Sequence, residues 1–380
     1  MTHERPALER RVLSALDAEP ARIPVVLGGC GSGRTSLLVR VAARLGDRRA
    51  RYIDVERVAS TPERFLAAVT RRAPAAAGDT AASLPAGRHT PRAAFESLLA
   101  FVGRSDDAPP VFLLDEWLDL RTLESFPGLR GALGELVEAL VQSSNRFVLA
   151  SRFANRTRRL LDRFPARVEL IHLPPLDPSE VAAALPSRSA AGDASRRTEL
   201  GRLVHALAAG RPSYVETLAA TLASRADQQE DPVGALAAQM AAGAPLSRLC
   251  RFSYELRLHR ARGYGALKAI LDILADLEPL TLTQIARRLG RTPGSTRDYL
   301  SWLEDVDLIA MQEKRYRFAD PLLRLWVRLH SRPAAPGEGE RAREAREYAA
   351  LRLGCGEAPA AAPARIVPPA RRPRDLIEID

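Results

Sequence analysis

A glycine-rich loop between an apolar run and a helix start constrains this 380-residue chain more than any other feature. The loop follows the apolar residues 23–27, and the pattern G-x-x-x-x-G-K-[ST] is met at every position except Arg34, which stands in place of lysine. Glycines let the backbone aim its N–H groups at an anion, and the next helix N-terminus adds partial positive charge. The loop therefore predicts a phosphate site formed by Gly28, Gly29, Cys30, Gly31, Ser32, Gly33, Arg34, Thr35 and Ser36. An ordinary glycine-rich turn between a strand and a helix is the alternative.

Composition sets the wider limits. The length suggests two or three domains, and 46% hydrophobic residues are enough for buried cores. A net charge of +10 favours an anionic partner. Only Lys268 and Lys314 are lysines, so 54 of the 56 basic residues are arginines. In a chain with this bias, an arginine at position 34 is a less unusual replacement for lysine.

Three cysteines and an unremarkable N-terminus point to a reducing compartment. Cys30, Cys250 and Cys355 are far apart and odd in number, which gives neither a disulfide framework nor a metal-ligand spacing. No apolar core of a signal peptide and no apolar run of membrane-spanning length are present. We therefore expect a cytoplasmic protein with no membrane partner.

Two carboxylates follow a second apolar run, Val111 to Leu114. An apolar run with a polar end is typical of a buried parallel strand, and ligands bind beyond the carboxyl ends of such strands. Asp115 is thus expected to reach Mg²⁺ together with the hydroxyl of Thr35, and Glu116 to polarise an attacking water. The alternative is a solvated Asp-Glu turn.

Polar residues also follow the apolar run 146–150. Ser151 at this end is expected to contact the γ-phosphate or the attacking water. Arg152 is the first of a group of arginines that are candidates for an arginine finger, in cis or from another subunit, the others being Arg156, Arg158 and Arg159. Solvated arginines in an arginine-rich chain are the alternative for each of them.

The sequence predicts five strands in all, at residues 23–27, 50–55, 111–115, 146–150 and 167–173. With the phosphate loop after the first and Asp-Glu after the third, the chain resembles P-loop ATPases that carry a catalytic glutamate, the AAA+ and STAND groups. The resemblance implies an α/β fold with a parallel five-stranded sheet, ATP and Mg²⁺ as ligands, and a helical lid. Gly210-Arg211-Pro212 resembles the G-x-P lid motif, which implies nucleotide contacts for Arg211 and Pro212. A plain turn between helices is the alternative.

A winged helix-turn-helix is predicted downstream. Thr281-x-x-Gln284 is a capping box, Gly290 ends that helix, and residues 308–311 and 316–318 are short strands around a turn. Residues 245–330 carry 15 basic and 10 acidic side chains, which favours DNA. The expected DNA-contacting residues are Arg291, Ser295, Thr296 and Arg297 in the groove, and Lys314, Arg315 and Arg317 on the backbone. Acidic residues on the same helix favour the alternative, a contact with protein.

The phrase Arg315 to Trp326, with its tyrosine, Asp-Pro and tryptophan, resembles the end of the winged helix in the archaeal-type ATPases. The resemblance spans roughly residues 5–330 and departs from the family at Arg34 and in a weak N-terminal entry motif. The expected domains are a P-loop core at 1–173, a lid at 174–236, a winged helix at 237–330, and a tail at 331–380. The tail is predicted to hold a charged helix and a low-complexity segment.

Two functions fit these features. The first is a weakly hydrolysing ATPase that acts as a nucleotide switch coupled to double-stranded DNA, or to a protein partner, through the winged helix. The second is a sensor or scaffold that binds ATP without hydrolysing it and uses the winged helix for protein contact. Arg34 separates the two, because a guanidinium and an ammonium are not interchangeable at a phosphate. A finger supplied in trans would additionally require a homo-oligomer.

Overall fold

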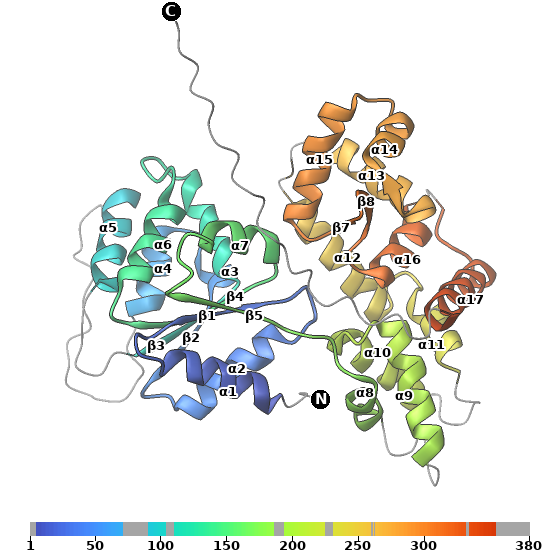
Figure 1. The fold of residues 1–380 in the computed structure, drawn as a ribbon, viewed down its shortest axis with the longest axis horizontal. Helices are drawn as coiled ribbons and strands as arrows, with labels where there is room; N and C mark the ends of the chain where they lie inside the picture. Colours follow the sequence, from blue (N-terminus) through green and yellow to red (C-terminus); the bar gives the residue numbers. More distant parts are fainter. Residues whose placement is uncertain are drawn as a thin grey trace, which may run out of the picture.

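The computed structural model describes residues 5–70, 90–103, 110–185, 194–224, 231–259, 261, 263–331 and 334–354. Two lobes are visible in Figure 1, an N-terminal lobe built on a sheet and a C-terminal lobe built mainly of helices. Residues 71–89 lie outside the described residues, as does the low-complexity part of the tail. Within the described ranges, every helix is too short or too polar to cross a membrane.

The N-terminal lobe contains a fully parallel five-stranded sheet in the order β2-β3-β4-β1-β5. Its strands are β1 (Ile23–Leu27), β2 (Ala50–Asp54), β3 (Val111–Asp115), β4 (Arg146–Ser151) and β5 (Val168–His172). All residues of β1 and β3 are buried, which explains their continuous apolar sequence, because a strand covered on both faces has no polar side. The predicted α/β P-loop architecture is confirmed.

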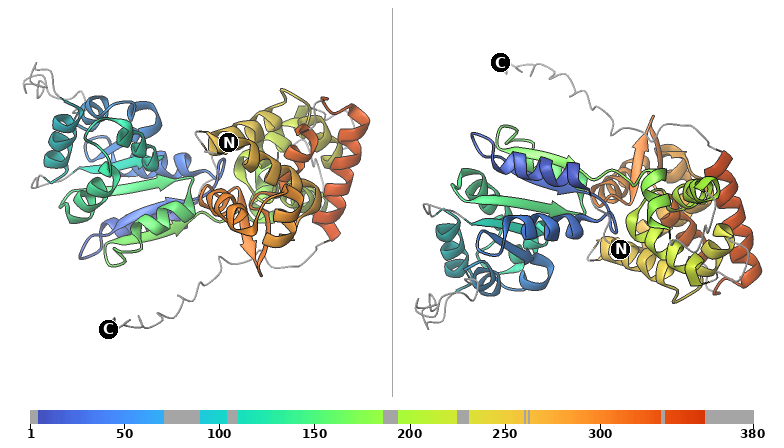
Figure 2. Two further views of the ribbon diagram at one scale, coloured as in Figure 1. Left: turned by 90° about the horizontal axis from the view of Figure 1, so that it is seen from above. Right: turned by 90° about the horizontal axis from the view of Figure 1, so that it is seen from below.

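Helices cover both faces of this sheet (Figure 2). On one face lie α1 (Pro6–Leu16) and α2 (Arg34–Leu45), whose buried side chains pack with Val26 and Leu113 of the sheet. The opposite face packs against a second cluster formed by α3 (Val55–Val58), α4 (Pro62–Thr70), α5 (Pro91–Val102), the 3-10 helix η1 (Trp117–Ser125) and α6 (Ala132–Gln142). The short helix α7 (Ala154–Leu161) follows β4 and lies on the side of the C-terminal lobe.

The C-terminal lobe begins with four lid helices and a connecting helix. The lid helices are α8 (Pro178–Ala184), α9 (Ala194–Ala208), α10 (Pro212–Ser224) and α11 (Pro232–Gln239), and the connecting helix is α12 (Pro245–Leu258). An Asp177–Glu180 capping box starts α8 directly after the turn that leaves the sheet.

The winged helix follows in the predicted order. It comprises α13 (Tyr264–Leu277), β6 (Leu280–Thr281), α14 (Leu282–Leu289), α15 (Pro293–Asp305), β7 (Ile309–Gln312) and β8 (Arg315–Phe318). The Thr281–Gln284 capping box is present, and Gly290 ends α14 in a left-handed conformation. The two-residue turn of the wing places Glu313 and Lys314 at positive φ, as a hairpin turn with the right-handed strand twist requires.

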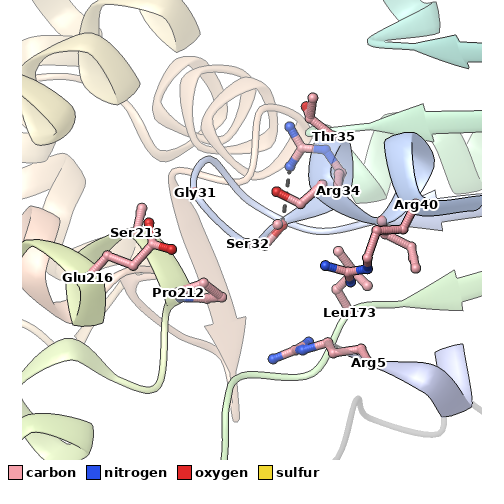
Figure 3. A pocket seen from close by; sticks show the side chains of 13 residues that line it. Arg5, Gly31, Ser32, Arg34, Thr35, Arg40, Leu173, Pro212, Ser213 and Glu216 are labelled. Carbon is pink, nitrogen blue, oxygen red and sulfur yellow. Dashed lines mark hydrogen bonds between the residues drawn. The ribbon is translucent and has the colours of Figure 1, made fainter. Parts of the chain in front are cut away.

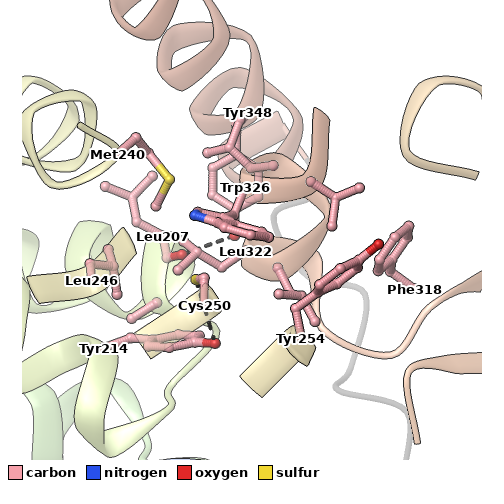
Figure 4. Packing of buried hydrophobic residues seen from close by; sticks show 14 of the residues in the cluster. Leu207, Tyr214, Met240, Leu246, Cys250, Tyr254, Phe318, Leu322, Trp326 and Tyr348 are labelled. Carbon is pink, nitrogen blue, oxygen red and sulfur yellow. Dashed lines mark hydrogen bonds between the residues drawn. The ribbon is translucent and has the colours of Figure 1, made fainter. Parts of the chain in front are cut away.

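One hydrophobic core serves the whole C-terminal lobe. It runs from Leu176 at the lid entrance to Ala349 on the last helix, α17 (Glu338–Gly354), and includes side chains of the winged helix and of α16 (Pro321–His330). Figure 4 shows Tyr348 of α17 and Trp326 of α16 packed beside the lid. Tyr348 donates a hydrogen bond to the carbonyl of Leu207 at 2.9 Å. The expected lid, winged helix and charged tail helix are therefore packed as one unit.

Candidate functional site

The glycine-rich loop joins β1 to α2 at the edge of the sheet that faces the C-terminal lobe. Gly31 and Gly33 have φ values of +74° and +92°, in the left-handed region that side chains disfavour. Together with the first turn of α2, the loop lines a cavity of about 230 Å³. The other wall comes from the N-terminal segment, α2, the residue after β5, and the lid, through Arg5, Arg40, Leu173, Pro212 and Ser213 (Figure 3).

Two arginines that were not expected from the sequence point into this cavity (Figure 3). Arg5 donates to the carbonyl of Pro174 at 2.6 Å, but its buried Nη2 has no hydrogen-bond partner. Arg40 pairs with Glu9 at 2.7 Å, and its buried Nη1 also lacks a partner. Unpaired buried donors are costly, so these two nitrogens mark places where a ligand acceptor would be accommodated.

Thr35 and Asp115 meet under the loop. The Thr35 hydroxyl donates to Asp115 Oδ2 at 2.6 Å, and the Tyr52 hydroxyl donates to the same oxygen at 3.0 Å. Burial and the Asp115 charge raise the pKa of Tyr52, so this tyrosine stays a neutral donor. A hydroxyl and a carboxylate in contact offer oxygen ligands of the type that Mg²⁺ prefers, so the residues fit that ion.

Arg34 bridges the loop to Glu116. Its Nη1 donates to the carbonyl oxygens of Gly28 and Gly29, the latter at 2.5 Å, and its Nη2 pairs with Glu116 Oε1. The second oxygen of Glu116 accepts hydrogen bonds from the backbone N–H of Arg152 at 3.2 Å and from its Nε at 2.9 Å. Both carboxylate oxygens of Glu116 are therefore held by arginines in this arrangement.

Arg152 lies at the centre of a buried ion network. It is 3% exposed and also pairs through Nη2 with Asp119 at 2.8 Å and with Glu56 at 3.1 Å. Burial alone would lower the pKa of Arg152, but the three carboxylates hold it above its ordinary value. Burial raises the pKa of Asp119 to about 6, against the opposing charge of Arg152. The guanidinium of Arg152 is thus fixed beside Glu116.

The other residues expected after β4 have separate environments. Ser151 is fully buried, and its hydroxyl accepts from the N–H of Phe153 at 3.1 Å. Arg158 lies 3.3 Å from the ring of His172, whereas Arg159 pairs with Asp305 of the winged helix. Arg156 lies over the ring of Phe153, with 5.4 Å between Cζ and the ring centroid.

The turn before α10 rests on the loop. The Ser213 N–H donates to the carbonyl of Gly31 at 3.2 Å, and a Cβ on Gly31 would lie 1.9 Å from the Ser213 hydroxyl oxygen. Arg211 donates to the carbonyl of Cys30 at 3.1 Å and pairs with Asp320 at 3.1 Å. Arg211 therefore contacts the loop backbone, while Pro212 lines the cavity.

Arg257 is a loop-contacting residue that the sequence interpretation missed. It belongs to α12 and is 3% exposed, and its Nη2 lies 3.3 Å from where a Cβ on Gly29 would stand. Its Nη1 donates to the carbonyl of Asp307 at 3.0 Å. The available signal was helical spacing, because Arg257 shares the buried face of α12 with Cys250 and Tyr254.

Basic residues just before α15, on α15 and on the wing are exposed. They are Arg291, Arg297, Lys314, Arg315 and Arg317, with Ser295 half-buried beside them. Thr296 was expected to face DNA, but it is fully buried and its hydroxyl bonds to the Thr292 carbonyl. It occupies the same inward stripe of α15 as Leu300 and Leu303, which corrects that expectation.

The C-terminal end of α15 is docked on the N-terminal lobe. Asp307 accepts from the N–H of Ala154 at 2.6 Å, and Asn155 donates to the Glu304 carbonyl at 2.9 Å. The Asp305–Arg159 pair lies at the same junction. Burial raises the pKa of Asp307 to about 6, with the charge of Arg257 opposing the rise. The winged helix is thus joined directly to α7.

Comparisons with known proteins agree with this architecture. Residues 268–312 match the protein-family model for the IclR helix-turn-helix domain. A Walker-type ATPase of Pyrococcus abyssi, PABY2304, is structurally similar at 17% identity, with 86% of this chain and 96% of that chain covered and a TM-score of 0.62. The Orc1 protein of Aeropyrum pernix in complex with DNA is matched at 16% identity over 84% of this chain and 90% of that chain, with a TM-score of 0.42. No curated protein matches the sequence. The chain thus has the fold of a Walker-type ATPase followed by a winged helix.

Proposed function

We propose that this protein binds ATP with Mg²⁺ at the glycine-rich loop, hydrolyses it slowly, and transmits the nucleotide state to DNA through its winged helix. The contact between the Thr35 hydroxyl and Asp115 Oδ2, at 2.6 Å, carries the proposal. It joins a phosphate-binding loop to a strand-end carboxylate next to a potential base, Glu116. Such an arrangement serves a triphosphate and its metal ion better than it serves an ordinary turn.

Each residue has a defined task in this proposal. The loop N–H groups and Arg34 bind the β- and γ-phosphates, and Thr35 and Asp115 hold Mg²⁺, which would neutralise phosphate charge when bound. Glu116 orients the attacking water and accepts its proton. The cavity of about 230 Å³ is below the roughly 300–1,000 Å³ usual for a small-molecule site, so nucleotide entry requires the lid turn to move off the loop.

Slow turnover follows from the ion pairs of Glu116. A carboxylate that accepts from Arg34 and Arg152 must exchange at least one of these partners for water before it acts as a base. A γ-phosphate would compete with Glu116 for Arg34, which releases the carboxylate only in the nucleotide complex. The same observation supports the second candidate, a nucleotide sensor that does not hydrolyse ATP.

DNA is the partner that the surface charge supports. The exposed residues Arg291 and Arg297 would face the groove with Ser295, and the wing residues Lys314, Arg315 and Arg317 would contact phosphates. One acidic group of α15 that favoured a protein partner, the Asp305 carboxylate, pairs with Arg159 of α7 and so is turned toward the N-terminal lobe. Asp298 remains exposed on α15.

ATP binding and turnover, measured with and without double-stranded DNA, test the proposal. We expect ATP·Mg²⁺ to bind and DNA to change the rate of phosphate release. Absence of nucleotide binding at millimolar concentration would exclude both candidate functions. Binding without any turnover would exclude the ATPase and favour the nucleotide sensor that does not hydrolyse ATP. Molecular mass with and without ATP shows whether a homo-oligomer forms. We expect the protein to act in the cytoplasm, where ATP and DNA are both present.

A further inference from the structure

Apart from Arg5 and Arg40 in the cavity, four arginines lie near the glycine-rich loop on the side of Glu116 and the lid, and three of these four have carboxylate partners. Arg34 pairs with Glu116, Arg152 pairs with three acidic residues, and Arg211 pairs with Asp320. Arg257 differs, because no carboxylate forms an ion pair with it among the residues that the structure describes. Its buried Nε also has no hydrogen-bond partner. A guanidinium stays charged in proteins, and the Asp307 carboxyl, which feels the charge of Arg257, makes no ion pair with it, so the buried charge is only partly compensated.

An anionic ligand that binds Arg257 would lie beside Gly29. An Nη2 atom of Arg257 lies 3.3 Å from where a Cβ on Gly29 would stand, so the absence of a side chain there permits this approach. The next residue, Cys30, is in the same electrostatic field. Burial alone would raise the pKa of its thiol, but Arg257 and Arg34 together hold that pKa below its ordinary value. The charges of Arg257 and Arg34 therefore both act on this part of the loop.

We propose that Arg257 contacts the γ-phosphate of the bound nucleotide and distinguishes ATP from ADP for the winged helix. This inference rests on the proposed binding of ATP at the loop. Arg257 would thus be an arginine finger supplied in cis. Arg152 was the candidate for this role from the sequence, but three carboxylates hold its side chain. A planar guanidinium with a free Nε is well suited to a phosphate, which it binds through paired hydrogen bonds.

A single residue connects Arg257 to the winged helix. Arg257 Nη1 donates to the carbonyl of Asp307, whose side chain accepts the N–H of Ala154 at the start of α7. Asp307 has a φ of +53° and lies two residues beyond the last residue of α15. A shift of Arg257 toward a γ-phosphate would therefore alter the contact that holds α15 on the N-terminal lobe. This gives nucleotide state a physical route to the DNA-binding surface.

The test compares affinities for ADP and for the imido-bridged, non-hydrolysable ATP analogue, both with Mg²⁺, in the full chain. Arg257→Ala is expected to weaken binding of the analogue by about tenfold or more while leaving ADP within about twofold, the size expected for loss of a charge-assisted contact. Arg257→Lys, which keeps the charge without the paired donors, is expected to fall between. Arg251→Ala, an exposed arginine of the same helix, is the matched control and is expected to change neither affinity.

Arg257→Gln separates a structural role from a phosphate contact. Glutamine retains a donor for the Asp307 carbonyl but carries no charge, and it serves if the alanine variant fails to fold. It is expected to lose the preference for the ATP analogue while its thermal unfolding stays close to that of the wild type. Equal losses for both nucleotides, or none in the folded glutamine and lysine variants, overturn the inference. If the wild type binds neither nucleotide, the proposed function fails instead.

Discussion

Asp320 and Arg211 form an ion pair between the N-cap of α16 and the turn that precedes α10, with 3.1 Å between Oδ2 and Nη1. Asp320 is 1% exposed and also accepts hydrogen bonds from the Tyr214 hydroxyl and from the Leu322 N–H. Arg211 in turn donates to the carbonyl of Cys30 in the loop. The Asp-Pro step after the wing is therefore a helix cap that also anchors the lid turn.

Asp320→Ala is expected to destabilise the C-terminal lobe by about 3–5 kcal/mol, because it leaves the Arg211 charge and the Tyr214 hydroxyl without their shared partner. Urea unfolding followed by circular dichroism measures the change. Asp298→Ala removes an exposed carboxylate of α15 and is expected to stay within about 0.5 kcal/mol. Equal stabilities of the two variants would show that the buried pair contributes nothing.

Arg34→Lys is expected to raise ATP turnover by about tenfold or more. Arginine holds the loop carbonyls with Nη1 and Glu116 with Nη2, whereas a compact ammonium cannot span both sites with one planar group. Lysine would thus leave Glu116 freer to act on water. Phosphate release under saturating ATP is the measurement, and a rate equal to or below that of the wild type contradicts this role of Arg34.

Glu116→Gln is expected to reduce turnover by about 10²–10⁴-fold while ATP binding persists, because the amide cannot accept a proton from water. Binding and turnover must be measured on the same preparation. Glu124→Gln, in the nearby 3-10 helix η1, provides a control that removes an acidic group without touching the loop. An unchanged rate in Glu116→Gln would remove this residue from the mechanism.

Asp307 is expected to give folding stability a pH dependence. Its pKa of about 6 exceeds the ordinary 3.8, so the folded state binds the proton more tightly than the unfolded state. The resulting stabilisation is fully present below about 3.8 and is lost as pH rises through about 6, by roughly 3 kcal/mol. The unfolding free energy of the wild type should therefore fall relative to that of Asp307→Asn as pH rises from 4 to 8. A constant difference between them would refute the assignment.

Arg297→Ala and Lys314→Ala are each expected to lower the salt dependence of DNA binding, by about one unit of slope if each contacts one phosphate. Both residues are exposed, one on α15 and one at the tip of the wing. Thr296→Ser is the contrasting change, because Thr296 is buried and should leave the slope unaltered. Unchanged slopes for both basic-residue variants would show that DNA contacts another surface of the protein.

Local patterns made the fold largely predictable. The strand at residues 23–27, the loop glycines and the strand end at Asp115 are neighbours in sequence, so spacing and hydrophobicity sufficed to identify them. The capping box of α14 and the Gly290 stop were predictable for the same reason. Thr296 was misplaced although its spacing from Leu300 already indicated the inner stripe of the helix.

The contacts between the lobes were not predictable. Arg257 reaches the loop from a helix far along the chain, and nothing local distinguishes it from the other 53 arginines except its place on a buried helix face. The engagement of Glu116 by Arg34 and Arg152 likewise depends on where three strand ends and a helix meet. These pairings join residues that are far apart in the sequence, so the spacing of residues along the chain does not predict them.

The shared core of the C-terminal lobe has a consequence for how the protein is made. The two clusters around the sheet are complete once the ribosome has produced residues up to Ile171, but the core that starts at Leu176 includes Ala349. At roughly 5–20 residues per second, the completed lid helices wait about 6–22 s for their last packing partner. During synthesis, a folded sheet therefore precedes an unfinished lid whose apolar faces are still uncovered.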